Sequence, residues 1–292
     1  MTNSRRKGPN PTAARRRLAR AMRQLRDDAG IGREAAAKHA GIGPATLSRL
    51  EAGTHAPKPA NVFTLCMHYG LDADQANAYA ELARQCKEPS WWHRYNDVLP
   101  KGFDVFVGLE DEATRVQCWQ PTLIDGRFQT ADYMTALARA EIDVPQDQTV
   151  ERLVSVRQQR QARLLDGSDD RDPAEIWSIL HESTLRTMVG GRAVMKAQLD
   201  RLLELSVHPL VDLQVLPFAK GAHPCMQNGF HVLGFPDPAD PETTYIEYRT
   251  GGIFLDDPDE VAIYGRIFDQ LRARALDPDE TRALITQTRD AM

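Results

Sequence analysis

The sequence lacks paired cysteines and long apolar runs. It contains no Cys-x-x-Cys motif, since the four cysteines lie far apart at Cys66, Cys86, Cys118 and Cys225. This spacing argues against a zinc ribbon and a disulfide scaffold. His223-Pro-Cys225 brings together two soft ligands without a third, so we expect no metal site. No segment approaches the ~20 apolar residues of a membrane span, and we expect a cytoplasmic protein.

The motifs of several enzyme classes are also missing. We find no nucleophile elbow, phosphate-binding P-loop, dinucleotide fingerprint or metal-binding triad. The Gly190-Gly191 pair is too short to hold a phosphate and is more typical of a break between two helices. We therefore expect neither catalysis nor a cofactor.

Charge is distributed unevenly along the 292 residues. Residues 1–60 hold 13 Lys and Arg against 4 Asp and Glu, a formal charge of +9. The remaining residues hold 23 against 37, a charge of −14. A basic N-terminal part joined to an acidic remainder is typical of a DNA-binding module attached to a part that avoids DNA.

The segment Gly41-Ile-Gly-Pro-Ala-Thr-Leu-Ser-Arg-Leu-Glu-Ala-Gly53 has the pattern of one short capped helix. Gly43 can cap a helix that starts with Pro44, because proline at the first position loses no helical hydrogen bond. Leu47 and Leu50 form a narrow apolar stripe, and Gly53 stops the helix. A preceding helix at roughly 33–40, the turn at Gly41 and this second helix predict a helix-turn-helix.

With Ala29-Gly-Ile-Gly-Arg-Glu-Ala-Ala-Ala-Lys-His-Ala-Gly41 in front and Ser48-Arg-Leu-Glu-Ala-Gly53 at the close, residues 14–70 resemble the XRE-type, lambda-repressor-like DNA-binding domain. The resemblance implies that the second helix reads double-stranded DNA in the major groove. It implies a structural salt bridge between Arg26 and Glu51, and phosphate contacts from Arg33 and Lys58. The residues that it places at the base edges are Pro44, Ala45, Thr46, Ser48 and Arg49.

Among these reading residues, Arg49 is expected to carry most of the specificity. Pro44 and Ala45 occupy positions where the family often has glutamine, so methyl contact with thymine would replace hydrogen bonds there. One such domain covers a half-site, and we therefore expect a homodimer on a palindromic operator.

The predicted organisation has three parts. Residues 1–12 read as a disordered basic arm, and residues 13–87 as an all-α helix-turn-helix domain of five helices. Residues 91–292 read as an α/β (α+β) domain with a mixed sheet, serving sensing and dimerisation. Its predicted strands cover 175–181, 211–216, 230–235 and 244–248, and its predicted helices cover 131–139, 149–165, 192–205, 257–274 and 279–288.

The second part resembles the large C-terminal domain of actinobacterial XRE regulators of the WhiJ-like group. The shared motifs include Gly108-Leu-Glu110, Arg157-Gln-Gln-Arg160, His181-Glu-Ser-Thr-Leu185 and Gln214-Val-Leu-Pro-Phe218. In that group the domain is uncharacterised and is frequently encoded beside a small acidic partner protein. Where the group usually has Leu-Val-Pro-Gly-Leu-Leu-Gln-Thr, this chain has Leu123-Ile-Asp-Gly-Arg-Phe-Gln-Thr130, which introduces Asp125 and Arg127.

Three hypotheses for the second part follow. It senses a small-molecule effector or a protein signal and changes the DNA affinity of the dimer; it is a pure protein-interaction domain, comparable to an antitoxin that binds a partner; or, least favoured, it is an enzyme. Loops at strand ends are where α/β sheets bind ligands, and the polar residues there are Glu182, His223, Glu247 and Arg249. Each of these four also has a purely structural explanation.

Overall fold

The computed structural model describes residues 10–88, 90–100, 102–141, 146–167, 172–237 and 240–292. Within it the chain divides into two compact units, an N-terminal unit up to His93 and a C-terminal unit from Arg94 onward. Each unit has its own hydrophobic core, and each is described by itself below.

The N-terminal unit consists of helices, as predicted. Within its described part there are five α-helices: α1 (Pro11–Asp28), α2 (Arg33–His39), α3 (Pro44–Glu51), α4 (Pro59–His68) and α5 (Ala73–Gln85). Their apolar sides meet in one core that includes Leu18, Met22, Leu47, Val62 and Leu65. A capping box starts α5, in which the side chains of Asp72 and Gln75 each accept a hydrogen bond from the other's backbone N–H.

The first helix begins earlier than the predicted domain start at residue 13. The Asn10 side chain accepts hydrogen bonds from the backbone N–H groups of Thr12 and Ala13, so α1 starts at Pro11. Asn10 and Thr12 are also buried. The predicted disordered arm is therefore wrong for residues 10–12, and its residues 1–9 lie outside the described part of the chain.

The C-terminal unit contains a six-stranded mixed sheet with the strand order β3-β2-β1-β4-β5-β6. β1 pairs in parallel with β2 and β2 with β3, whereas β4, β5 and β6 add antiparallel. The strands are β1 (Arg115–Gln120), β2 (Glu175–His181), β3 (Val211–Leu216), β4 (Phe230–Gly234), β5 (Thr243–Tyr248) and β6 (Gly251–Leu255). The predicted mixed sheet is confirmed, but β1 and β6 were not predicted.

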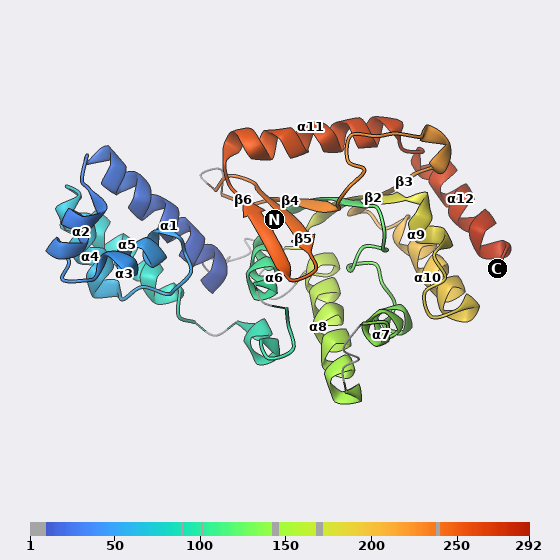
Figure 1. Ribbon diagram of the computed structural model, residues 1–292, viewed down its shortest axis with the longest axis horizontal. Coiled ribbons are helices and arrows are strands. Elements are labelled where there is room, and N and C mark those ends of the chain that lie inside the picture. The colour runs from blue at the N-terminus through green and yellow to red at the C-terminus, as the bar shows by residue number, and fades with distance from the viewer. Residues whose placement is uncertain (1–9, 89, 101, 142–145, 168–171, 238–239) are drawn as a thin grey trace, which may run out of the picture. The chain divides into compact units, whose positions relative to one another are not determined.

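Helices cover both faces of this sheet (Figure 1). One face carries α11 (Pro258–Arg274), whose Val261, Phe268 and Leu271 pack on Trp119 and Ile179. Helices on the other face and at its edge form the two remaining cores. They are α6 (Phe103–Glu112), α7 (Ala131–Arg139), α8 (Asp147–Leu165), α9 (Glu182–Arg186), α10 (Arg192–Leu205) and α12 (Pro278–Asp290). A short 3-10 turn at Phe218–Lys220 follows β3, and another, Trp91–Tyr95, spans the boundary between the two units in the sequence.

The two edge strands of the sheet, β3 and β6, differ in their neighbours. At β3, the backbone N–H of Leu276 donates to the carbonyl of Val215 at 2.9 Å, and the N–H of Val215 donates to the Thr281 hydroxyl at 3.2 Å. Residues at and before α12 thus cover the β3 edge. At the opposite end, β6 follows β5 through a two-residue turn and forms the last strand of the sheet.

Candidate functional site

Helix α3 presents one buried side and one exposed side. Leu47 and Leu50 are buried in the core of the N-terminal unit. The residues that the resemblance places at the base edges are all exposed: Pro44, Ala45, Thr46, Ser48 and Arg49. The amphipathic pattern of the sequence therefore leaves the proposed reading surface accessible, with small side chains that allow close approach to a groove.

The basic residues of this surface lie around α3. The Arg49 side chain folds back along its own helix, where its Nε donates to the carbonyl of Ala45 at 3.3 Å. Arg33 and Ser48 contribute to the lining of an open cleft of about 560 Å³ between the starts of α2 and α3. Lys58 is exposed as the residue that precedes α4.

A buried ion pair fixes the end of α3 against α1. Arg26 donates from Nε and Nη2 to the two carboxylate oxygens of Glu51 at 2.6 and 3.2 Å. The hydrogen bonding of Arg26 to Glu51 is the main cause that raises the pKa of Arg26. Arg33 joins the pair at 3.2 Å while its side chain stays 49% exposed. Arg33 therefore has a structural partner on one side and accessible surface on the other.

In the C-terminal unit, Glu182 and His223 lie at the edge formed by the carboxyl ends of the parallel strands. Glu182 directly follows β2 and is the first residue of α9. Its carboxylate pairs with Arg186 at 2.6 Å and accepts the backbone N–H of Phe218 at 2.8 Å. It thereby ties α9 to the loop that follows β3.

Aromatic and imidazole rings that were not predicted as site residues surround His223. The Trp119 ring lies 5.0 Å from the His223 ring and the His181 ring lies 5.9 Å from it, while Phe218 packs edge-on against His181 at 5.0 Å. Burial lowers the pKa of both histidines, and the two imidazoles lie near each other. We name His181, His223, Trp119 and Phe218 the ring cluster. Phe218 is 52% exposed, so the cluster is open to solvent on one side.

Glu247 and Arg249 lie at the end of β5, which is three strands from β2 in the sheet. Arg249 is in the turn after β5, where it pairs with Glu141 at 2.5 Å. Burial raises the pKa of Glu247, and the guanidinium groups of Arg160 and Arg157 act against this increase. The four predicted residues therefore lie at the same end of the strands, the end where the parallel strands have their carboxyl termini, but form two separate groups.

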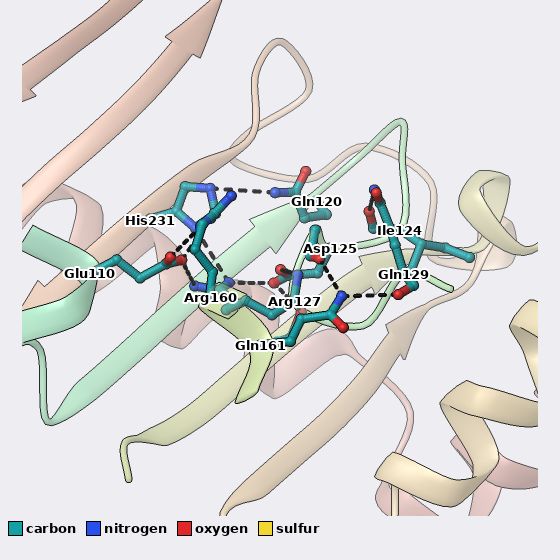
Figure 2. Close-up of polar contacts among 11 residues, drawn as sticks. Glu110, Gln120, Ile124, Asp125, Arg127, Gln129, Arg160, Gln161 and His231 are labelled. Atoms are coloured by element: carbon teal, nitrogen blue, oxygen red, sulfur yellow. Dashed lines mark hydrogen bonds and ion pairs between the residues drawn. The ribbon is translucent and has the colours of Figure 1, made fainter. Parts of the chain in front are cut away.

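A buried charge cluster, which we define as Glu110, Asp125, Arg127, Arg160 and His231, brings together side chains from distant parts of the chain (Figure 2). Arg160 binds Glu110 through two hydrogen bonds of 2.6 and 2.9 Å. The Arg127 guanidinium bonds the Asp125 carboxylate, and both side chains are 1% exposed. The cluster thus joins α6, α8, β4 and the loop after β1 within the apolar interior.

Protonation in this cluster is fixed by the arginines. A guanidinium can only donate, so the Nη2 of Arg127, 3.3 Å from Nδ1 of His231, requires that nitrogen to be an acceptor. Burial, reinforced by the charge of Arg127, lowers the pKa of His231 to about 3. Burial opposes ionisation of Asp125, but the attraction of Arg127 outweighs it and lowers the pKa of Asp125. The cluster therefore holds two carboxylates, two guanidinium groups and a neutral imidazole.

Amide side chains hold the loop after β1 in place, both from α8 and within the loop itself. The Nε2 of Gln161 donates to the carbonyls of Gly126 and Gln129, both at 2.9 Å, and Gln129 donates to the carbonyl of Ile124 at 2.7 Å. The departure at Asp125 and Arg127, noted in the sequence, thus marks a loop that is fixed from inside. In the described part of the chain, no group of three or more His, Cys, Asp and Glu side chains could hold a metal ion.

These features define a helix-turn-helix protein with a second, α/β unit. Residues 17–79 match a helix-turn-helix domain, which indicates DNA binding. Residues 103–287 match the family described as "Domain of unknown function (DUF5753)", and the chain belongs to that family. No curated protein and no solved structure matches the chain. None of the helices in the described residues has the length and apolar character of a membrane span.

The Asp125–Arg127 pair gives a prediction for stability. Asp125→Asn removes the nearest counter-charge of the buried Arg127 guanidinium and leaves only Glu110, 3.6 Å away, which Arg160 also binds. We therefore expect the free energy of unfolding to fall by about 3–5 kcal/mol. Asp125→Asn combined with Arg127→Leu removes both charges and should recover most of this loss. Urea denaturation of the three proteins measures the difference. A double variant that is less stable than Asp125→Asn would contradict the assigned pairing.

His231 gives a prediction for the dependence of stability on pH. Its pKa is about 3 in the fold and about 6.5 in an unfolded chain, so between these values the unfolded chain binds an extra proton. Stability should therefore fall as the pH decreases from about 6.5, by on the order of 1–2 kcal/mol at pH 5.

The variant His231→Gln should remove this part of the pH dependence. Urea denaturation at pH 7 and pH 5 gives the comparison, and the pH 7 value reports the loss of packing alone. An equal decrease between the two pH values in both proteins would show that His231 is not the group responsible.

Proposed function

We propose that this protein is a transcriptional regulator that binds DNA in a sequence-specific manner through α3 and acts as a homodimer on a palindromic operator. The observation that carries the proposal is the exposed outer side of α3 in a basic helix-turn-helix unit, while its Leu47 and Leu50 are buried. We also place the unit in the XRE type and the chain in the WhiJ-like group, on the motifs quoted above.

In this proposal the residues around α3 have distinct tasks. Arg49 gives up its bond to the carbonyl of Ala45 and forms a bidentate contact with guanine. Thr46 and Ser48, whose side chains are shorter than that of Arg49, add hydrogen bonds to bases or phosphates. Arg33 and Lys58 bind phosphates on either side, which contributes affinity without selecting a sequence.

We propose that the C-terminal unit binds a signal, either a small molecule or a small partner protein, at the ring cluster. The exposed ring of Phe218 and the half-buried imidazoles of His181 and His223, beside the Glu182 carboxylate, offer both apolar and polar contacts at the carboxyl ends of the strands, where α/β sheets bind ligands. A ligand there changes DNA affinity if it binds two states of the dimer unequally.

We favour binding over catalysis for this unit. The nearest hydroxyl to His181 is that of Ser183, and it donates its hydrogen bond to the carbonyl of Pro121 at 2.7 Å. In this proposal the Ser183 hydroxyl fixes the start of α9, and His181, whose Nδ1 lies 2.8 Å from that hydroxyl, is a contact residue for the signal.

The DNA-binding proposal predicts different effects for two kinds of residue. Arg49→Ala should weaken binding to a site selected from a random duplex library by about 1–3 kcal/mol and leave binding to random duplex nearly unchanged. Lys58→Ala should weaken binding to both duplexes by the same factor and reduce the slope of log affinity against log salt concentration by about 1. Fluorescence anisotropy over a range of salt concentrations measures both effects.

Arg84→Ala is the matched control, because Arg84 is an exposed arginine of the same unit that lies on α5 and pairs with Glu81. It should leave both affinities unchanged. Equal losses for Arg49→Ala on selected and random duplexes would refute the reading role of Arg49, and an N-terminal unit without affinity for any duplex at low salt would refute the proposed function.

The sensing proposal is tested by native mass spectrometry of the full chain. We expect a bound small mass or a bound partner protein whose occupancy falls at least about tenfold in the variant Phe218→Ala. Met226→Ala is the control, since Met226 is 63% exposed in the same loop but is not part of the ring cluster. Equal occupancy in both variants, or chemical conversion of the bound mass, would contradict this proposal.

A further inference from the structure

Arg157 on α8 lacks the partner that the buried arginines of the same unit have. Its side chain is half-buried and its Nη1 atom is completely buried, yet that atom has no hydrogen-bond partner among the described residues. Arg127 and Arg160, whose side chains are buried, each bind a carboxylate. A shielded guanidinium without a partner costs free energy, and such a group is typical of a site that takes up a further molecule.

Two polar groups of β5 are also without a partner. In the described part of the chain, neither the Tyr245 hydroxyl nor the Glu247 carboxylate forms a hydrogen bond or an ion pair. Both side chains point to the same face of the sheet, since side chains alternate along a strand. A Cβ atom on Gly252, the residue opposite Glu247, would lie 2.5 Å from the Tyr245 hydroxyl oxygen. That hydroxyl therefore lies beside Glu247 at the end of β5.

Ring contacts bring α8 against this end of β5. The Tyr245 ring stacks on Phe106 at 4.3 Å, and the Arg160 guanidinium lies 5.4 Å from the same Phe106 ring. Arg157 precedes Arg160 by three residues, so both lie on one side of α8. Burial raises the pKa of Glu247, and the charges of both arginines act against this increase. We name Arg157, Tyr245 and Glu247 the unpaired cluster.

The charged groups next to the unpaired cluster already have partners. Arg160 binds a carboxylate of the buried charge cluster, and Glu141 pairs with Arg249. No ion pair in the described residues joins Arg157 to Glu247, although each charge affects the pKa of the other group. One guanidinium and one carboxylate are therefore left, and a ligand with a single charge would satisfy only one of them.

We propose that the unpaired cluster binds the zwitterionic head group of an α-amino acid. The carboxylate of the ligand accepts hydrogen bonds from Arg157 and Tyr245, and its ammonium group donates to Glu247. Each charge of the ligand then meets an opposite charge, and all three side chains gain a partner. Glu247 retains exposed surface, which opens the site to solvent.

This site is separate from the ring cluster, because β5 lies three strands from β2 in the sheet. It adds a second ligand to the proposed function and does not depend on DNA binding or on a signal at the ring cluster. Its failure and the failure of the proposed function are therefore measured in different experiments.

The class of ligand is tested by isothermal titration calorimetry of the dialysed full-length protein with each of the standard L-amino acids. At least one should bind. Its N-acetyl derivative lacks the ammonium charge and its primary amide lacks the carboxylate, so each should bind at least about tenfold more weakly. Equal binding of either derivative, or no binding of any amino acid, would overturn the inference.

The position of the site is tested with two variants and matched controls. Arg157→Gln and Glu247→Gln each remove one charge of the site and should weaken binding of that amino acid by at least about tenfold. Arg139→Gln and Glu204→Gln are the controls, because both side chains are exposed on other helices of the unit. These controls, and Phe218→Ala in the ring cluster, should keep the wild-type affinity. Equal affinities for Arg157→Gln and Arg139→Gln would place the ligand elsewhere.

A second measurement separates an unpaired guanidinium from one that the fold requires. Arg157→Met removes a charge without a partner, so the urea midpoint of the ligand-free protein should stay the same or increase. Arg160→Met breaks the two hydrogen bonds to Glu110 and should lower that midpoint. An equal decrease in both variants would mean that Arg157 is bound within the fold, and the inference would be wrong.

Discussion

The burial of Arg127 is the constraint on which the C-terminal unit depends. A guanidinium that is 1% exposed requires a nearby counter-charge, and Asp125 supplies it from the same loop. Its remaining partners are Glu110 on α6 and His231 on β4, and Arg160 on α8 binds the same Glu110, so the loop, both helices and the strand have to be in place together. The Nε and Nη1 atoms of Arg127 have no hydrogen-bond partner among the described residues, so this arrangement is costly in free energy as well as specific.

The N-terminal unit relies on a smaller version of the same principle. Arg26 and Glu51 form a buried pair between α1 and the end of α3, and Arg33 joins it from α2. The pair fixes α3 against helices on its buried side, which keeps the outward side free. Each unit thus fixes neighbouring elements of its fold through a buried arginine–carboxylate pair.

Local signals in the sequence were sufficient for the N-terminal unit. Pro44, Gly53 and the Asp72–Gln75 capping box define helix ends through short-range chemistry, and the predicted helices agree closely with the structure. In the C-terminal unit β1 was missed, because Arg115, Gln117 and Gln120 interrupt its apolar residues. Of these, Gln120 lies near His231 of the buried charge cluster and Arg115 pairs with Glu242. β6 was missed because it begins with two glycines. The position of Glu182 and His223 at the carboxyl ends of parallel strands predicted them as site residues. The sequence contained no such signal for the rings around His223, because aromatic residues are common in hydrophobic cores.

The covered β3 edge has a consequence for the order in which the chain acquires its structure. Val215 on β3 forms its hydrogen bonds with Leu276 and Thr281, which lie near the end of the sequence. The central strand β1 pairs with β4, which follows it by more than a hundred residues. The five N-terminal helices form their core entirely from residues 14–86, so all parts of this core are synthesised long before the last strand of the sheet. The sheet has to wait until synthesis is almost complete, so each nascent chain carries a folded helical unit before its second unit exists.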